Sequence, residues 1–144
     1  MASTAGAQIV DPSLFRLLVE LETRKAQRMR YVVSLVCLGV DATGPAAVPA
    51  SALVEGLATG IRATDAIAAA KGSETLTLLL VDAEDTDLPT LMDRLTPRLD
   101  NVRWSAGGAC FPRTATTAGE LLSQAQAMMK EAKRLGAGRL QLPR

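Results

Sequence analysis

The sequence predicts an α/β (α+β) fold, in which a mixed central β-sheet has helices packed on it. Apolar runs typical of strands alternate with amphipathic helical patterns along the chain. Two of the apolar runs are separated only by a glycine turn, at residues 71–75, which indicates a β-hairpin. The expected order of elements is α-β-α-β-β-α-β-α-β, and its core is the βαββαβ arrangement of ferredoxin-like folds.

The chain has 144 residues, enough for one domain with a sizeable core. Residues 1–11 are expected to form an N-terminal tail or linker, and residues 12–144 the domain. Asp11 and Pro12 are typical of an N-cap and a first helical position, so a helix is predicted over residues 12–30.

The remaining elements follow from the same apolar patterns and from the glycines and prolines between them. They are a central strand at 31–40, a loop at 41–49, a helix at 50–62, hairpin strands at 65–70 and 75–82, a helix at 88–99, a strand at 102–111, a helix at 117–135 and an edge strand at 139–142. Pro97 is expected to break the last turn of its helix. Gly107 and Gly108 indicate that a neighbouring element closely approaches their strand.

Composition and charge exclude several classes of function. Sixteen basic and fifteen acidic residues leave a net charge of +1, too small to favour binding to nucleic acid or to a membrane surface. No apolar run approaches the length of a transmembrane helix. The sequence has no histidine, and Cys37 and Cys110 lie in apolar runs, which favours buried free thiols in a reducing cytosol. We therefore expect a cytoplasmic protein.

Several short motifs, in the right order, resemble the GGDEF domain of diguanylate cyclases. They lie between residues 15 and 142 and so span nearly the whole chain. The matching segments are Arg62-Ala63-Thr64-Asp65 for R-x-x-D, Lys71-Gly72-Ser73-Glu74-Thr75 for the turn G-G-[DE]-E-F, residues 105–109 for S-x-G-x-A, and, in part, residues 125–133 and 136–139 for the last helix and G-R-N-R. The resemblance implies a fold of nucleotide-cyclase type and a role in bacterial signalling.

The resemblance also implies that the catalytic site is degenerate. Cyclases of this family bind two Mg²⁺ ions through the first Asp of a D-x-D strand and the third residue of the turn. These positions are Gly39 and Ser73 here, and neither side chain offers the carboxylate that a hard cation prefers. Asp41 and Glu74 are the nearest acidic residues. We expect no Mg²⁺, no other cofactor and no cyclase activity, because phosphoryl transfer needs the metal to offset the triphosphate charge.

Part of the family's nucleotide-binding set is altered as well. Lys71 replaces the first glycine of the turn, and Gln126 and Lys130 replace an Asp and a Tyr of the helix motif. Lys133 matches the lysine that contacts phosphate, whereas Ala137 stands where an arginine is expected. Binding of GTP without turnover therefore stays open.

The R-x-x-D motif is the inhibitory site of the family, which binds cyclic di-GMP. An arginine can bind phosphate or the O6/N7 edge of guanine, and an aspartate can accept hydrogen bonds from guanine N1–H and N2–H. Arg62 and Asp65 supply both groups, and the spacing makes Arg94 the second arginine, with Arg98 a poorer candidate. The resemblance thus implies an inactive GGDEF domain that serves as a cyclic di-GMP receptor or regulatory module. The alternative is an ordinary surface ion pair between Arg62 and Asp65.

An alternative function of a different class is a protein–protein interaction or dimerisation domain with no nucleotide ligand. The first helix, over residues 15–28, is one candidate surface, because family members usually follow a sensory domain through a helix at this position. The charged hairpin tip with Lys71 and Glu74 is either solvated or a contact surface for another protein. The expected partners are a protein or an upstream sensory domain, or a second copy in a homodimer.

Overall fold

The computed structural model describes residues 6–41, 48–100 and 102–143, and their strands form one mixed sheet in the order β1-β3-β4-β2-β5-β6. The strands are β1 (Gln8–Ile9), β2 (Val33–Val40), β3 (Ala66–Ala68), β4 (Thr75–Val81), β5 (Trp104–Phe111) and β6 (Arg139–Gln141). β2 pairs antiparallel with β4 and β5, whereas the outer pairs β1–β3 and β5–β6 are parallel. The predicted mixed sheet is confirmed, and its central strand, β2, was predicted as such.

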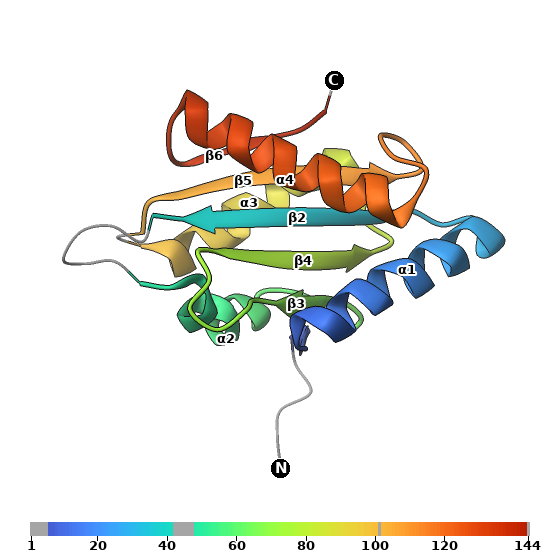
Figure 1. The fold of residues 1–144 in the computed structure, drawn as a ribbon, viewed down its shortest axis with the longest axis horizontal. Coiled ribbons are helices and arrows are strands. Elements are labelled where there is room, and N and C mark those ends of the chain that lie inside the picture. The colour runs from blue at the N-terminus through green and yellow to red at the C-terminus, as the bar shows by residue number, and fades with distance from the viewer. Residues whose placement is uncertain (1–5, 42–47, 101, 144) are drawn as a thin grey trace, which may run out of the picture.

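Helices cover both faces of the sheet, α1 and α4 on one side and α2 and α3 on the other (Figure 1). The helices are α1 (Pro12–Met29), α2 (Val54–Ala58), α3 (Leu88–Leu95) and α4 (Ala118–Leu135), with 3₁₀ turns η1 (Ala50–Leu53), η2 (Asp85–Asp87) and η3 (Thr96–Leu99). Within the described ranges, no helix is both long enough and apolar enough to cross a membrane.

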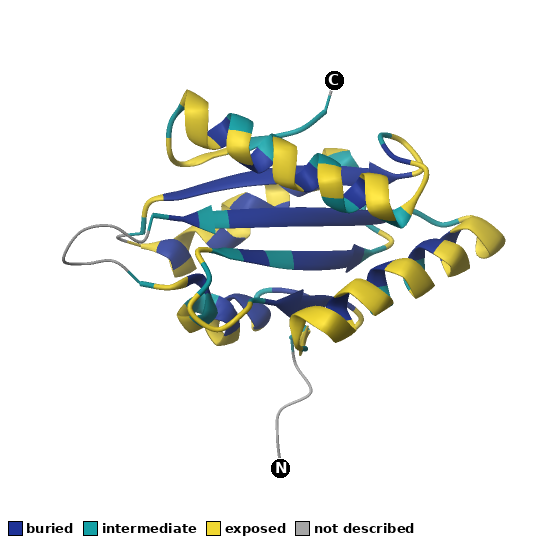
Figure 2. Cartoon of the chain, in the orientation of Figure 1, coloured by how far each residue is buried: buried dark blue, intermediate teal, exposed yellow. Residues whose placement is uncertain are grey.

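Two hydrophobic layers enclose the sheet because neighbouring residues of a strand point to opposite faces. Leu35 and Cys37 of β2 pack in the layer of α1 and α4, and Val36 and Leu38 pack in the layer of α2 and α3. Figure 2 shows the resulting burial, with the central strands buried and the outer sides of the helices exposed. Cys37 and Cys110 are both buried and free, as predicted.

Gly107 explains how closely α4 lies on β5. A Cβ atom at this position would lie 2.0 Å from the backbone nitrogen of Met129 and 2.3 Å from the carbonyl oxygen of Ala125. At Gly108, on the opposite face, a Cβ atom would lie 2.6 Å from Cδ1 of Leu88. The predicted close approach is confirmed at Gly107, where the neighbouring atoms belong to the backbone of α4, whereas at Gly108 the closest ones belong to leucine side chains.

Two sequence predictions need correction. The helix expected at 50–62 is a 3₁₀ turn followed by a short α-helix that ends at Ala58, because Gly56 and Gly60 lower the helical propensity of this segment. The expected tail is wrong for Gln8–Ile9, which forms β1 and pairs with the open edge of β3. Residues 1–5 of that tail, and 42–47 of the expected loop, lie outside the described residues.

Candidate functional site

Arg62 and Asp65 lie between α2 and β3, beside the C-terminal end of β4. Asp65 is buried, with 2% of its surface exposed. Its Oδ1 accepts a hydrogen bond from the backbone N–H of Val81 at 2.8 Å, and its Oδ2 lies 3.5 Å from Nε of Arg62. Nη2 of Arg62 donates to the carbonyl oxygen of Val81. The two predicted residues therefore form an ion pair that is anchored to the end of β4.

The surroundings of Asp65 leave its carboxylate little freedom to bind a ligand. Burial raises the pKa of Asp65 above its ordinary value, and the Val81 N–H and the Arg62 guanidinium act in the opposite direction. Both carboxylate oxygens face these partners. Arg62 differs, because 56% of its side chain is exposed and a guanidinium has five N–H donors, of which the ion pair and the Val81 carbonyl engage two.

A cavity of about 340 Å³ opens next to this ion pair, with Arg62 and Arg94 both in its wall. Arg94, on α3, is exposed, and its Nε donates to the carbonyl oxygen of Gly60 at 3.0 Å. The structure thus brings together Arg62, Asp65 and Arg94, which the sequence singled out. Arg98 is not among the lining residues and reaches the Arg94 carbonyl instead, at 3.4 Å.

Asp82 is a lining residue of the same cavity that sequence reasoning missed. It directly follows β4 and has φ +60°, a backbone conformation in which aspartate and asparagine are enriched. Its side chain is exposed and has no hydrogen bond or ion pair with any residue that the structure describes, whereas its backbone N–H donates to the carbonyl oxygen of Val32 at 2.8 Å. The nearby Asp87, also in the wall, accepts a hydrogen bond from Glu84 N at 2.9 Å. The sequence carried no signal for Asp82 beyond its place at the end of a strand.

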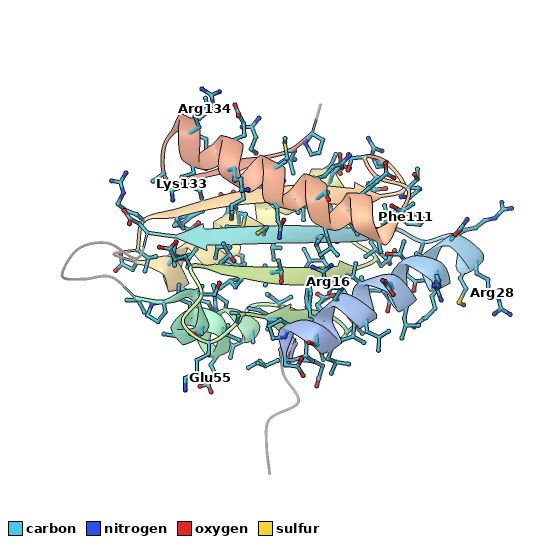
Figure 3. The ribbon with its side chains drawn as sticks, in the orientation of Figure 1. Arg16, Arg28, Glu55, Phe111, Lys133 and Arg134 are labelled. Carbon is cyan, nitrogen blue, oxygen red and sulfur yellow. The ribbon has the colours of Figure 1, made fainter. Side chains whose placement is uncertain are left out.

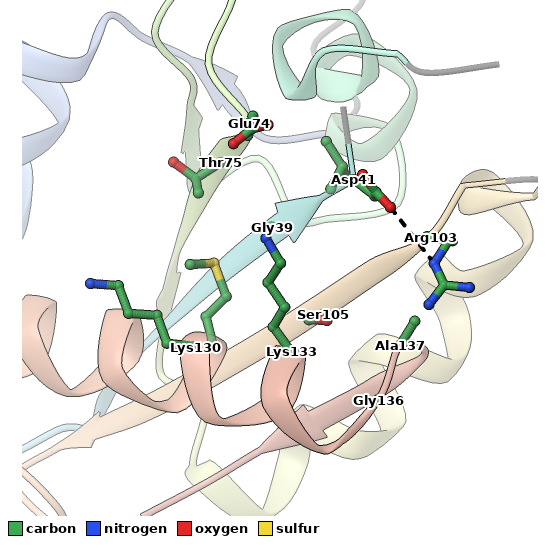
Figure 4. A pocket seen from close by; sticks show the side chains of 12 residues that line it. Gly39, Asp41, Glu74, Thr75, Arg103, Ser105, Lys130, Lys133, Gly136 and Ala137 are labelled. Atoms are coloured by element: carbon green, nitrogen blue, oxygen red, sulfur yellow. Dashed lines mark ion pairs between the residues drawn. The ribbon is translucent and has the colours of Figure 1, made fainter. Parts of the chain in front are cut away.

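A second cavity, of about 330 Å³, lies at the other end of β4 (Figure 4). Lys130 and Lys133 reach toward it from α4, and Glu74 borders it from the hairpin turn. Arg103, another lining residue, pairs with Asp41 through Nε and Oδ2 at 3.8 Å. Lys133, the predicted phosphate contact, therefore lies in a cavity with two further cations.

Two positions near this second cavity, Gly39 and Ser73, are those at which the resemblance places the magnesium ligands, and the acidic residues that line the cavity are Asp41 and Glu74. A Cβ atom at Gly39 would lie 2.8 Å from Sδ of Met129. The methionine side chain therefore occupies the space that the side chain of an aspartate at this position would need. Ser73 offers a hydroxyl, which accepts a hydrogen bond from the backbone N–H of Thr75 at 3.1 Å. Hard divalent cations prefer several carboxylate oxygens, and these two positions supply none.

The hairpin turn itself has the predicted position between β3 and β4. Lys71, Gly72 and Glu74 are exposed, whereas Ser73 and Thr75 are half-buried. Gly72 has φ +75°, which favours glycine, and the Ser73 N–H donates to the Ala70 carbonyl at 3.0 Å. The turn is therefore well formed although it lacks the acidic third residue.

No protein-family model matches the sequence, and a comparison with curated proteins finds no match. Solved structures do match. The GGDEF domain of YfiN, also called TpbB, from Pseudomonas aeruginosa has a TM-score of 0.82 at 18% identity, over 99% of both chains. A microbial GGDEF domain that interacts with cyclic di-GMP has a TM-score of 0.78 at 23% identity, over 93% of this chain and 91% of that one.

A third GGDEF domain, that of DgcB from Caulobacter crescentus in complex with cyclic di-GMP, has a TM-score of 0.71 at 11% identity, over 99% of this chain and 96% of that one. At such identities the likeness concerns the fold. The mixed sheet, the helices on its two faces and the hairpin all take part in the match, since nearly the whole chain is covered. The chain therefore has the α/β fold of GGDEF domains.

Proposed function

We propose that this chain is a catalytically inactive GGDEF-type signalling domain that binds cyclic di-GMP between Arg62 and Arg94. The observation that carries the proposal is the shared cavity, in which guanidinium groups from two separate elements line one space of about 340 Å³. Two of the compared GGDEF domains interact with cyclic di-GMP, which supports this choice of ligand. Both cysteines are free and buried, which suits a cytoplasmic protein.

The two arginines bind the ligand through donors that remain accessible. Arg62 keeps about three N–H donors beyond those that face Asp65 and Val81. Arg94 keeps both terminal nitrogens, since among the residues that the structure describes its side chain engages the Gly60 carbonyl through Nε alone. Planar guanidinium groups bind phosphate oxygens or the O6/N7 edge of guanine with two parallel hydrogen bonds, so each arginine can hold one of these groups.

In this proposal, the Asp82 carboxylate accepts the hydrogen bonds from guanine. Recognition of N1–H and N2–H needs an accessible carboxylate oxygen, and both oxygens of Asp65 face partners within the chain. Asp82 lines the same cavity with an exposed side chain. In this proposal Asp65 positions Arg62, and Asp82 contacts the base.

The absence of cyclase activity belongs to the same proposal. Gly39 and Ser73 supply no carboxylate, and the Met129 side chain lies against Gly39. Without a metal pair the domain cannot offset the charge that develops on a transferred phosphoryl group. Incubation with GTP and Mg²⁺ or Mn²⁺ is expected to yield no cyclic di-GMP, and measurable synthesis would refute this part.

Calorimetric titration with cyclic di-GMP tests the binding proposal. We expect a dissociation constant on the order of micromolar or tighter, with binding lost in Arg62→Ala and in Arg94→Ala. Arg98→Ala is the matched control, because it removes a neighbouring arginine that does not line the cavity. A flat titration of the folded wild-type protein, or equal loss of affinity in Arg98→Ala, would contradict the proposal.

A protein-interaction domain without a nucleotide ligand is the second candidate. It is favoured by the exposed leucines on α1 and by the exposed charged tip of the hairpin, with Lys71 and Glu74. Variants Lys71→Ala and Glu74→Ala test the tip. If cyclic di-GMP does not bind and these variants lose a protein partner of the wild type, this second function replaces the first.

A further inference from the structure

The cavity at the N-terminal end of β4 has more cationic than anionic side chains in its wall. The cations are Arg103, Lys130 and Lys133, and the carboxylates are Asp41 and Glu74. Asp41 and Arg103 pair with each other at 3.8 Å, so their charges offset. Neither lysine has a hydrogen bond or ion pair with any residue that the structure describes. Two ammonium groups therefore remain in this wall against the single carboxylate of Glu74.

Both lysines reach the cavity from the same side of α4. They are three residues apart, a spacing that places two side chains on one side of a helix. Figure 4 shows Lys133 reaching from the helix toward Gly39, with Lys130 beside it. Figure 3 shows Lys133 on the sheet side of the last turn of α4, whereas Arg134 points away from the sheet. The two ammonium groups are thus directed toward one space, and the absent side chain of Gly39 leaves that space open.

Ser105 is an independent indication that this cavity takes a ligand. It lies on β5 opposite Gly39 of β2, and it lines the cavity although it is only 6% exposed. Its hydroxyl has no hydrogen bond with any residue that the structure describes. Buried polar groups in proteins nearly always have a partner, because an unsatisfied one is destabilising. An oxygen-rich group bound in the cavity would give this hydroxyl an acceptor.

The charges of this wall favour direct binding of an anion over binding of a divalent cation. Mg²⁺ prefers several carboxylate oxygens, whereas Gly39 offers none and Asp41 is paired with Arg103. In the described part of the chain, no cluster of three or more histidine, cysteine or acidic side chains could hold a metal ion. The ammonium groups of Lys130 and Lys133 would repel a divalent cation, and the same charges attract phosphate oxygens.

We propose that this cavity binds a phosphate-bearing ligand directly through Lys130 and Lys133, without a divalent cation. Each ammonium group offers three N–H donors, and Ser105 adds a hydroxyl donor. The two ammonium charges offset the phosphate charge, which is the task of the cation in a metal-dependent site. The cavity shares no lining residue with the cavity of Arg62 and Arg94, so binding here does not depend on cyclic di-GMP binding there.

Calorimetric titration with sodium tripolyphosphate, in a buffer that contains EDTA, tests direct binding. We expect the wild type to bind, and Lys130→Ala and Lys133→Ala each to raise the dissociation constant by about 10- to 100-fold, since each removes a charged donor. Arg134→Ala is the matched control, because it removes the same charge from the same end of α4 but outside the cavity wall. No binding by the folded wild type, or equal weakening in Arg134→Ala, would overturn the proposal.

Added magnesium distinguishes direct binding from a metal-dependent site. Mg²⁺ competes with the lysines for the phosphate oxygens, so an excess of Mg²⁺ should weaken binding of tripolyphosphate. Tighter binding with Mg²⁺ than with EDTA would overturn the proposal. Titration with ATP and GTP in EDTA identifies the source of the phosphate, since tighter binding than tripolyphosphate indicates a nucleotide and equal binding indicates the phosphate chain alone.

Ser105→Ala tests the buried hydroxyl separately from the lysines. The variant should raise the dissociation constant for tripolyphosphate, because one donor is lost. Its midpoint of urea unfolding should be no lower than that of the wild type, because the hydroxyl has no partner among the described residues to lose. A less stable variant that binds as tightly as the wild type would show that the hydroxyl has a structural role and does not contact the ligand.

Discussion

The Asp65 carboxylate accepts a hydrogen bond from the backbone N–H of Val81, the last residue of β4, at 2.8 Å. This bond, together with the ion pair to Arg62, makes Asp65 a structural partner of the arginine that lines the cavity. In this chain, the R-x-x-D motif therefore leaves its arginine, and not its buried aspartate, accessible to a ligand. The role of the aspartate is to hold that arginine in place.

Replacement of Asp65 should show this structural role. Asp65→Ala leaves the Val81 N–H without an acceptor and is expected to lower the free energy of unfolding by about 1–3 kcal/mol. Asp65→Asn keeps one acceptor oxygen and should cost less than Asp65→Ala. Urea unfolding followed by circular dichroism measures both variants. Equal stability of Asp65→Ala and wild type would contradict the structural role.

Asp82→Asn should weaken cyclic di-GMP binding without affecting the fold. Asparagine tolerates the positive φ of this position, so the backbone is preserved. Loss of a charged acceptor is expected to raise the dissociation constant by about 10- to 100-fold, as measured by calorimetry. Asp93→Asn, on α3 and outside the cavity wall, changes the net charge equally and serves as the control. If both variants bind equally well, Asp82 does not contact the ligand.

Gly107→Ala should be severely destabilising. Its Cβ would lie 2.0 Å from the backbone of α4, so the helix would have to move as a whole. We expect a loss of about 3 kcal/mol or more in the free energy of unfolding. Gly119→Ala, in the first turn of α4, meets only Thr117 Oγ1 at 4.0 Å and should stabilise the protein by up to about 1 kcal/mol. Denaturant unfolding compares the two, and a tolerated Gly107→Ala would show that α4 is not fixed against β5.

Tyr31 should make stability fall at alkaline pH. Its hydroxyl donates a hydrogen bond to Glu22, and burial, this bond and the Glu22 charge raise its pKa from 10.0 to about 12. The folded state therefore keeps a proton that the unfolded state loses, so this contribution to stability is lost as pH rises from about 10 to about 12. Tyr31→Phe should remove that contribution. Tyr31 is the single tyrosine, so its ultraviolet absorbance reports the pKa directly, and an ordinary value near 10 would contradict the contact.

Sequence patterns predicted the sheet, its central strand β2 and the close contact at Gly107, because long apolar runs and paired glycines have few structural interpretations. They failed at residues 8–9, where pairing depends on an edge strand distant in the chain. They also overestimated the length of the second helix, because Gly56 and Gly60 lower the helical propensity of a segment whose apolar spacing is helical.

The candidate site was predicted in part, for a similar reason. Arg62, Asp65 and Arg94 do meet at one cavity. The burial of Asp65 depends on Val81, sixteen residues away, and the exposure of Asp82 depends on the backbone conformation at the end of β4. Neither property can be deduced from the spacing of an R-x-x-D motif, because both result from tertiary contacts.

Backbone NMR spectra of the labelled 15.1 kDa domain, recorded during titration with cyclic di-GMP, test the central claim most directly. The account predicts saturable shifts that gather around Arg62, Asp82 and Arg94 and leave the cavity of Lys133 unchanged. Shifts confined to the surroundings of Lys133 would contradict it. So would the absence of any shift at a cyclic di-GMP concentration that saturates a control receptor.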